Sequence, residues 1–173
     1  MTMPEDTKTE KENTQTRRQE GAKIGTVRVD IAHQEKKTFE AVYKTEEKSF
    51  QLLIDEPEVR GGKGLGPTPL GYFVTGAASC LMMQYANVLK EKPMPVESIK
   101  MLARAHNDRE ARVFKDMIYE VNLTGPISTT DAETLARAAS DRCFVENTIA
   151  KAIPITTEVH LNGQKVVTFT RNS

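Results

Sequence analysis

Apolar and polar residues alternate along residues 24–54. Three segments in this range place an apolar side chain at every second position: IGTVRVDIA from Ile24, TFEAVYKT from Thr38 and KSFQLLID from Lys48. A period of two is typical of half-buried β-strands. Because the links between the segments are short and polar, the pattern predicts a meander of three antiparallel strands. A loop rich in glycine and proline, residues 55–69, follows.

The stretch GPTPLGYFVTGAASCLMMQYANVLK, residues 66–90, contains no charged residue before Lys90. Thr68 is a suitable N-cap, and Pro69 is favoured at the first position of a helix. Since Pro93 cannot continue a helix, we predict a helix from about Pro69 to Lys90. Its faces are all apolar or small, which predicts a buried central helix. Gly, Thr, Gln and Asn residues interrupt the apolar run too often for a membrane span.

The remainder of the chain carries strand and helix patterns in turn. Residues 96–108 and 111–125 are typical of two strands with a turn between them. An amphipathic helix over residues 128–143 and a further helical segment over residues 144–153 follow. A last hairpin turns at Asn162-Gly163, a strong turn signal. Runs of strands interrupted by helices in this order indicate an α+β fold rather than a parallel α/β sheet.

The charges of the chain balance, with 24 Lys and Arg residues against 24 Asp and Glu residues. Bulk charge therefore gives no affinity for nucleic acid or for an acidic membrane surface, and we expect neither as a partner. Residues 1–22 are almost entirely polar and cannot bury enough surface to offset their ordering entropy. We expect a flexible tail over residues 1–22 and one domain over residues 23–173. No N-terminal segment has the order of a signal peptide, so we expect a cytoplasmic protein.

Cysteine and histidine are few, which limits the metal and redox chemistry of the chain. Cys80 and Cys143 do not form a CxxC pair, and the three histidines lie far apart, so we expect neither a metal site nor a bound cofactor. Cys80 falls in the middle of the uncharged helix. A free cysteine in such a place often behaves as a small buried hydrophobe. The residue pattern alone leaves the inert and the reactive interpretation open for both cysteines.

Four features of the chain together resemble the OsmC/Ohr superfamily. They are the glycine-rich loop, the proline-initiated apolar helix with a cysteine in its middle (GPTPLGYFVTGAASC), the two-strand unit with a charged turn (NDREARVFKDMIYEVNLTG), and a second cysteine on a later helix (ARAASDRCFVENTIAKAIPITTEV). The resemblance covers roughly residues 24–162. It implies an α+β fold in which curved antiparallel sheets wrap around the two long central helices of an intertwined homodimer.

The resemblance also implies a function in oxidative-stress defence, because active members of this superfamily are thiol peroxidases. Cys80 matches the cysteine that attacks an organic hydroperoxide, and Cys143 matches the cysteine that resolves the sulfenic acid as a disulfide. A dithiol reductant, with a lipoyl protein as one candidate, then reopens the disulfide. Arg60 matches the arginine whose charge favours the thiolate, with an ordinary solvated loop arginine as the alternative. Tyr72 and Phe73 could line a pocket for the peroxide, with core or dimer packing as the alternative.

The chain departs from the peroxidase pattern at the start of the uncharged helix. Peroxidase members usually carry a glutamate directly after the proline, where it orients the arginine, whereas Leu70 follows Pro69 here. Leucine cannot accept the hydrogen bonds of a guanidinium group. Glu56 or Glu58 could supply the missing carboxylate from the loop, although loop acids are usually solvated, and we expect Glu146, three residues after the second cysteine, to be exposed. The alternative function is therefore a non-catalytic ligand-binding or redox-sensing protein with the same fold.

Overall fold

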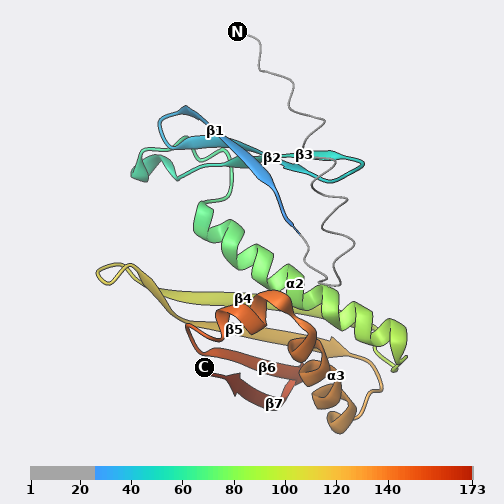
Figure 1. Ribbon diagram of the computed structural model, residues 1–173. Helices are drawn as coiled ribbons and strands as arrows, with labels where there is room; N and C mark the ends of the chain where they lie inside the picture. Colours follow the sequence, from blue (N-terminus) through green and yellow to red (C-terminus); the bar gives the residue numbers. More distant parts are fainter. Residues whose placement is uncertain (1–25, 173) are drawn as a thin grey trace.

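The computed structural model describes residues 26–172. Over that range the chain forms two β-sheets, three α-helices and one short 3-10 helix, in the order that the sequence predicts (Figure 1). The tail expected at residues 1–22 and the start of the first strand at Ile24 lie outside the described residues. Strands and helices occupy separate runs of the chain, which confirms the α+β class.

The first sheet is the meander predicted from the alternating pattern. Strands β1 (Val29–Glu35), β2 (Thr38–Lys44) and β3 (Ser49–Ile54) pair in the order β1-β2-β3, and both pairs are antiparallel. Figure 1 shows this sheet beyond the N-terminal end of the long helix, away from the other strands. The sheet has only sparse contacts with the helices and with the second sheet. Its position is therefore set mainly by the loop that joins it to the long helix.

Asp55 organises that loop. Its buried carboxylate accepts hydrogen bonds from the Thr38 hydroxyl and from the backbone N–H groups of Glu56, Lys63 and Leu65. Burial would raise the pKa of Asp55, but the hydrogen bonds outweigh burial, and the pKa lies below its ordinary value. In a strand or helix these three backbone N–H groups would donate to backbone carbonyl groups. Here they donate to the Asp55 carboxylate, which gives the loop a defined shape.

The loop also contains the short 3-10 helix η1 (Glu58–Arg60) and passes very close to its own backbone at residue 62. A Cβ atom at Gly62 would lie 1.8 Å from the carbonyl oxygen of Glu56, so no other residue type fits there. Gly61 ends η1 in the left-handed region at φ 86°, a conformation that glycine adopts readily. These two glycines hold Arg60 at the end of η1 in a fixed place.

Helix α2 (Pro69–Glu91) is the uncharged stretch, and its ends agree with the prediction to within one residue. The Thr68 hydroxyl accepts the N–H of Gly71 at 3.1 Å, so the predicted N-cap is confirmed. Pro69 occupies the first helical position, as expected.

Only one face of α2 is buried within the chain. That face consists of Ala77, Leu81, Tyr85 and Val88. Elsewhere on α2 large apolar side chains are exposed, namely Leu70, Phe73 and Met83. The prediction of a helix buried on every face is therefore wrong for the single chain, because the sequence of α2 is apolar on a face that nothing in residues 26–172 covers.

The second sheet consists of β4 (Ser98–Asp108), β5 (Val113–Thr124), β6 (Ile155–Leu161) and β7 (Gln164–Arg171), hydrogen-bonded in that order. Strands β4 and β5 form one antiparallel pair and β6 and β7 another, the latter through the predicted Asn162-Gly163 turn. Strands β5 and β6 run parallel, so the expectation of purely antiparallel pairing does not hold there. Parallel neighbours need a long crossover connection, which the helical segment between these two strands provides.

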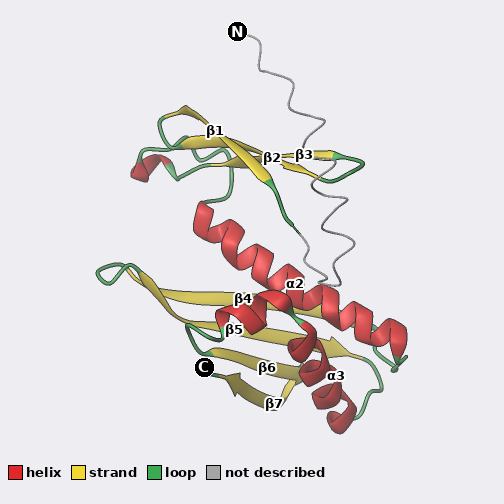
Figure 2. Cartoon of the chain, in the orientation of Figure 1, coloured by secondary structure: helices red, strands yellow, loops and turns green. Residues whose placement is uncertain are grey.

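Helices α3 (Thr129–Arg142) and α4 (Phe144–Ile149) form that crossover and pack with α2 on the second sheet (Figure 2). The Ser128 hydroxyl caps α3 by accepting the N–H of Asp131 at 3.1 Å, as its sequence predicts. Helices and sheet enclose one core, whose largest fully buried members are Tyr85, Tyr119, Leu81, Met117, Leu123, Leu135 and Ile155. Within residues 26–172 no helix is long and apolar enough to cross a membrane.

Candidate active site

Cys80 lies in the middle of α2, next to the buried Leu81. Its side chain is half-buried and packs against the hydrophobic core. The thiol is free, and it stands at the boundary between the buried face of α2 and the open one. A small molecule can therefore approach this sulfur from outside, which is not the case for a cysteine that only fills the core.

Cys143 occupies the junction between α3 and α4. It is the C-cap of α3 and the N-cap of α4, with extended backbone angles of φ −78° and ψ 110°. Its side chain is fully buried, and its Sγ accepts the backbone N–H of Glu146 at 3.5 Å. The predicted position of this cysteine at a helix start or bend is confirmed.

The fold brings the two thiols together although they are far apart in the sequence. Helix α2 packs on both α3 and α4, which places the Cys80 thiol close enough to Cys143 to affect the ionisation of its thiol. Burial raises the pKa of Cys143 to about 11, and the contact with Cys80 acts in the same direction. In the described part of the chain, no group of three or more His, Cys, Asp or Glu residues could hold a metal ion. The site itself offers two neighbouring thiols.

Glu146 lies beside this thiol pair with its carboxyl group fully buried, so the expectation that it is exposed is wrong. The Ser140 hydroxyl donates to its Oε1 at 2.6 Å, whereas its Oε2 has no hydrogen-bond partner. Burial raises the pKa of Glu146, and the hydrogen bond from Ser140 and the charge of Arg171 act against that rise. No local pattern indicates this burial, because α4 is too short to show an amphipathic period.

Two buried tyrosines complete the polar interior around the thiols. Tyr85 of α2 and Tyr119 of β5 are fully buried, and neither hydroxyl has a hydrogen-bond partner. Burial raises the pKa of both, and the nearby charge of Glu146 adds to the effect. For Tyr119 the two cysteines contribute as well. Both hydroxyls therefore stay protonated at any physiological pH.

Arg171, near the end of β7, closes the cluster from the sheet side. Its Nη1 donates to Ser140 Oγ at 3.0 Å and lies 3.2 Å from Asp141 Oδ1, and its Nη2 donates to Asn147 Oδ1 at 2.7 Å. Sequence reasoning missed this residue, because the family resemblance ended near residue 162 and an arginine at the end of an edge strand is usually solvated. The pairing of β7 with β6 places Arg171 next to the helices.

Arg60, which the sequence predicts as the activating cation, is the last residue of η1. It is not in contact with a thiol in the described part of the chain. Its Nε is 2.7 Å from Glu56 Oε2, and its side chain is about half exposed. Glu56 is thus the loop acid that forms an ion pair with this arginine. The sequence analysis named Glu56 and Glu58 as the two candidates for this role. No contact between Arg60 and either cysteine occurs within residues 26–172 of the single chain.

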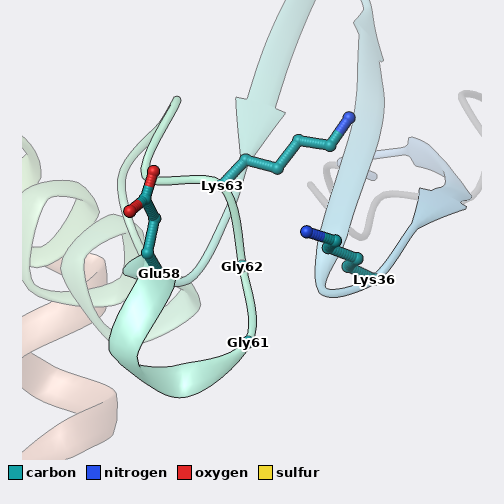
Figure 3. A pocket seen from close by; sticks show the side chains of 5 residues that line it. All are labelled: Lys36, Glu58, Gly61, Gly62 and Lys63. Carbon is teal, nitrogen blue, oxygen red and sulfur yellow. The ribbon is translucent and has the colours of Figure 1, made fainter.

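A shallow pocket lies beside the same loop, with a volume of about 630 Å³. Its lining residues are Lys36, Glu58, Gly61, Gly62 and Lys63 (Figure 3). Lys63 also forms an ion pair with Glu35 of β1. The pocket belongs to the loop and the first sheet, and neither cysteine lines it.

Tyr72 and Phe73, the predicted substrate-lining residues, lie on the first turns of α2. The Tyr72 hydroxyl donates to the Leu53 carbonyl at 2.9 Å and so ties α2 to β3. Phe73 stacks on Phe114 with ring centroids 5.2 Å apart, and its side chain remains exposed. Phe73 precedes Cys80 by two helical turns, so both side chains project from the same side of α2.

Known proteins match this chain in family and in fold. The sequence profile of the family described as OsmC-like protein matches residues 61–158, more than half of the chain. The chain belongs to the OsmC family. The matched range of this OsmC family member contains α2, both cysteines and Glu146. Curated proteins gave no match.

Solved structures of OsmC-type proteins share the fold of this chain. An OsmC-like protein from Mycoplasma pneumoniae is 18% identical, with a TM-score of 0.69 over 79% of this chain and 97% of that one. An organic hydroperoxide resistance protein from Elizabethkingia anophelis is 16% identical, with a TM-score of 0.65 over 80% and 98% of the two chains. The organic hydroperoxide resistance protein OsmC from Legionella pneumophila is 19% identical, with a TM-score of 0.57 over 81% and 97%. At these identities the likeness establishes the fold.

Proposed function

We propose that this OsmC family member is a thiol-dependent peroxidase that reduces organic hydroperoxides with Cys80 and Cys143, in defence against oxidative stress. The observation that carries the proposal is the pair of free thiols on packed helices, close enough for Cys80 to raise the pKa of Cys143. Two similar structures are of organic hydroperoxide resistance proteins, which supports this substrate class. Both thiols are free, as the reducing cytoplasm requires, and we propose that compartment.

Burial supports different roles for the two cysteines. Cys80 is half-buried and can meet a peroxide, whereas Cys143 is fully buried and its pKa is raised by that burial to about 11. The thiolate is the attacking species, so Cys80 is the first nucleophile and Cys143 the resolving thiol. The Cys80 sulfur bonds to the terminal peroxide oxygen, the O–O bond breaks, and the alkoxide leaves and takes up a proton to become an alcohol.

The resulting sulfenic acid condenses with the second thiol. Cys143 attacks the Cys80 sulfur, the S–S bond forms, and the S–O bond breaks with release of water. A dithiol reductant then exchanges with the disulfide and restores both thiols, and a lipoyl protein is one candidate for it. No bound cofactor takes part in this cycle.

We also propose that the protein acts as a homodimer in which the open face of α2 is covered by the second copy. The exposed apolar side chains Leu70, Phe73 and Met83 support this, as do Ile31 and Phe50 of the first sheet. Exposed apolar surface of this extent on one helix and the neighbouring sheet is typical of an interface. In this arrangement Arg60, braced by Glu56 instead of the carboxylate that Leu70 cannot supply, serves a thiol across the dimer.

The test is a thiol count before and after one equivalent of cumene hydroperoxide. The parent protein should lose two thiols rapidly, Cys143→Ser should accumulate a trappable sulfenic acid, and Cys80→Ser should not react. Two thiols that survive for many minutes in the parent would refute the peroxidase.

The alternative is a non-catalytic ligand-binding or redox-sensing protein, favoured by Leu70 in place of the glutamate. It predicts that Arg60→Met reacts with the peroxide at the same rate as the parent. A peroxidase that uses this guanidinium loses rate in the same variant, while Arg109→Met, in the β4–β5 turn, should leave the rate unchanged.

A further inference from the structure

Within residues 26–172, three side-chain oxygen atoms of Glu146 and of the two tyrosines that interact with it have no hydrogen-bond partner. They are Oε2 of Glu146 and the hydroxyl oxygens of Tyr85 and Tyr119. They come from α4, α2 and β5, and all three side chains are fully buried. Buried polar atoms nearly always find a partner, so three unpartnered ones in one cluster need a functional explanation.

The Glu146 carboxyl group accepts a hydrogen bond at Oε1 and has no hydrogen-bond partner at Oε2 within residues 26–172. Ser140 donates to Oε1 at 2.6 Å, and Arg171 donates to the same Ser140 Oγ at 3.0 Å. These bonds fix the orientation of the carboxyl group and leave the lone pairs of Oε2 unused. The backbone N–H of Glu146 contacts Cys143 Sγ at 3.5 Å, so the carboxyl group belongs to the helical turn that Cys143 caps.

We propose that Glu146 is the proton acceptor for Cys143 when the Cys80–Cys143 disulfide forms. This inference rests on the thiol cycle proposed above and adds the group that lets the buried thiol react. A thiol must lose its proton before it attacks, and Cys143 has no exposed surface through which water could take that proton. A carboxylate in the same buried interior, with an unpartnered oxygen and an interaction with the Cys143 thiol, meets this need.

The proton and the electrons balance without any further reactant. Cys143 Sγ attacks the Cys80 sulfur with its electron pair, the S–S bond forms, and the S–O bond of the sulfenic acid breaks. The thiol proton passes to Oε2 of Glu146 and from there to the departing hydroxide, which leaves as water. Glu146 returns to the carboxylate, and the next turnover starts from the same state.

The groups that face Glu146 come from each element packed around α4. They are Tyr85 of α2, Cys143 at the α3–α4 junction, Asp141 of α3, Tyr119 of β5 and Arg171 of β7. Ser140 and Arg171 favour the carboxylate, whereas burial and the charge of Asp141 oppose it and raise the pKa of Glu146. The raised pKa makes Glu146 a stronger base than an exposed glutamate. Both tyrosines stay protonated and cannot take this role.

The experiment measures the attack of Cys143 without a peroxide. Methyl methanethiosulfonate converts the half-buried Cys80 to its methyl disulfide, and Cys143 then displaces methanethiol, which mass spectrometry follows over time. Glu146→Gln keeps the acceptor for Ser140 and removes the base, and Glu133→Gln on the surface of α3 is the matched control. We expect release at neutral pH to slow by ~10²-fold in Glu146→Gln and to stay unchanged in Glu133→Gln.

The pH profile separates a proton acceptor from a residue that only supports the structure. In the parent, the release rate should rise as Glu146 ionises and then level off, and in Glu146→Gln it should rise with pH without levelling. Ser140→Ala keeps the carboxyl group but removes the hydrogen bond that lowers its pKa, so the parent's midpoint should move to higher pH.

Equal rates in the parent and Glu146→Gln, or an unmoved midpoint in Ser140→Ala, would overturn the proposal. If Glu146→Gln does not give the parent's far-UV circular dichroism, the Ser140→Ala profile decides alone. A parent that does not release methanethiol at all overturns both the thiol cycle and this inference. A parent that releases methanethiol normally but ignores cumene hydroperoxide overturns only the peroxidase.

Discussion

Replacing Tyr85 with phenylalanine should stabilise the protein, which is the opposite of what the loss of a buried hydroxyl usually does. The Tyr85 ring is fully buried on the inner face of α2, and its hydroxyl has no hydrogen-bond partner. That hydroxyl has given up its hydrogen bonds to water without replacement. Tyr85→Phe removes this cost and keeps the packing of the ring.

The size of the effect follows from the cost of an unpartnered group. A buried polar atom without a partner costs about 1–3 kcal/mol. The small void left by the missing oxygen offsets part of the gain. We therefore expect the free energy of unfolding to rise by about 1 kcal/mol. For a domain of this length that corresponds to a rise in Tm of about 2–4 °C.

Thermal and urea unfolding of both the parent and the variant give this difference, and Tyr72→Phe is the matched control. Tyr72 lies on the same helix, but its hydroxyl donates to the Leu53 carbonyl at 2.9 Å. Its loss should lower the free energy of unfolding by about 0.5–1.5 kcal/mol. The same chemical change on one helix should thus have opposite signs at the two positions.

A Tyr85→Phe variant that is destabilised as much as Tyr72→Phe would refute this reasoning. It would mean that the Tyr85 hydroxyl has a partner in solution, such as a bound water molecule. The interior around the thiols would then be hydrated. A water molecule, instead of the carboxyl group of Glu146, could then accept the proton of the Cys143 thiol.

Three further predictions concern other parts of the molecule. Between the ordinary pKa of glutamate and the raised pKa of Glu146, the folded state holds a proton that the unfolded state has lost, so the parent should lose stability as pH rises through that window. Urea unfolding at several pH values should show this slope in the parent and not in Glu146→Gln. Met83→Glu should separate the proposed homodimer into folded monomers, seen by light scattering after size exclusion. Gly62→Ala should lower the free energy of unfolding by more than about 2 kcal/mol, because its Cβ would meet the Glu56 backbone.

Each of these predictions has a control in the same chain. Glu133→Gln should keep the pH slope of the parent, because the side chain of this acid is 42% exposed and pairs with Arg137 on the surface of α3. Leu102→Glu introduces the same charge at another exposed apolar residue, on the second sheet opposite Glu120, and it should leave the dimer intact. Gly64→Ala changes a glycine whose Cβ would meet no atom within 4 Å, so only its positive φ costs stability, and a loss as large as that of Gly62→Ala would contradict the steric argument.

Local chemistry was enough to predict the elements of this fold from the sequence. The hydroxyl and ring of Thr68-Pro69 determine where α2 begins, and the conformational freedom of Asn162-Gly163 determines the last turn. Both depend only on residues close in sequence. The position of Cys143 between two helices followed in the same way, because the helical patterns on its two sides meet there.

Features that depend on distant contacts could not be predicted in this way. The parallel pairing of β5 with β6 depends on how the crossover helices pack. The burial of Glu146 depends on Ser140, which approaches it across a helix junction, and on Arg171, which arrives through the pairing of β7. The exposed face of α2 could not be predicted either. Its sequence is apolar and fits a buried contact, but the single chain makes no such contact there.

The Cys143 sulfur caps α4 in the reduced protein and forms a disulfide in the proposed cycle, and it cannot do both at the same time. In the reduced protein it accepts the backbone N–H of Glu146 and so holds the first turn of α4. When the same sulfur enters a disulfide, its torsion angles are set by the new bond, and that amide loses its acceptor. Oxidation should therefore increase the hydrogen-exchange rate of the Glu146 amide, so the redox state of the protein can be followed at a single backbone position by NMR.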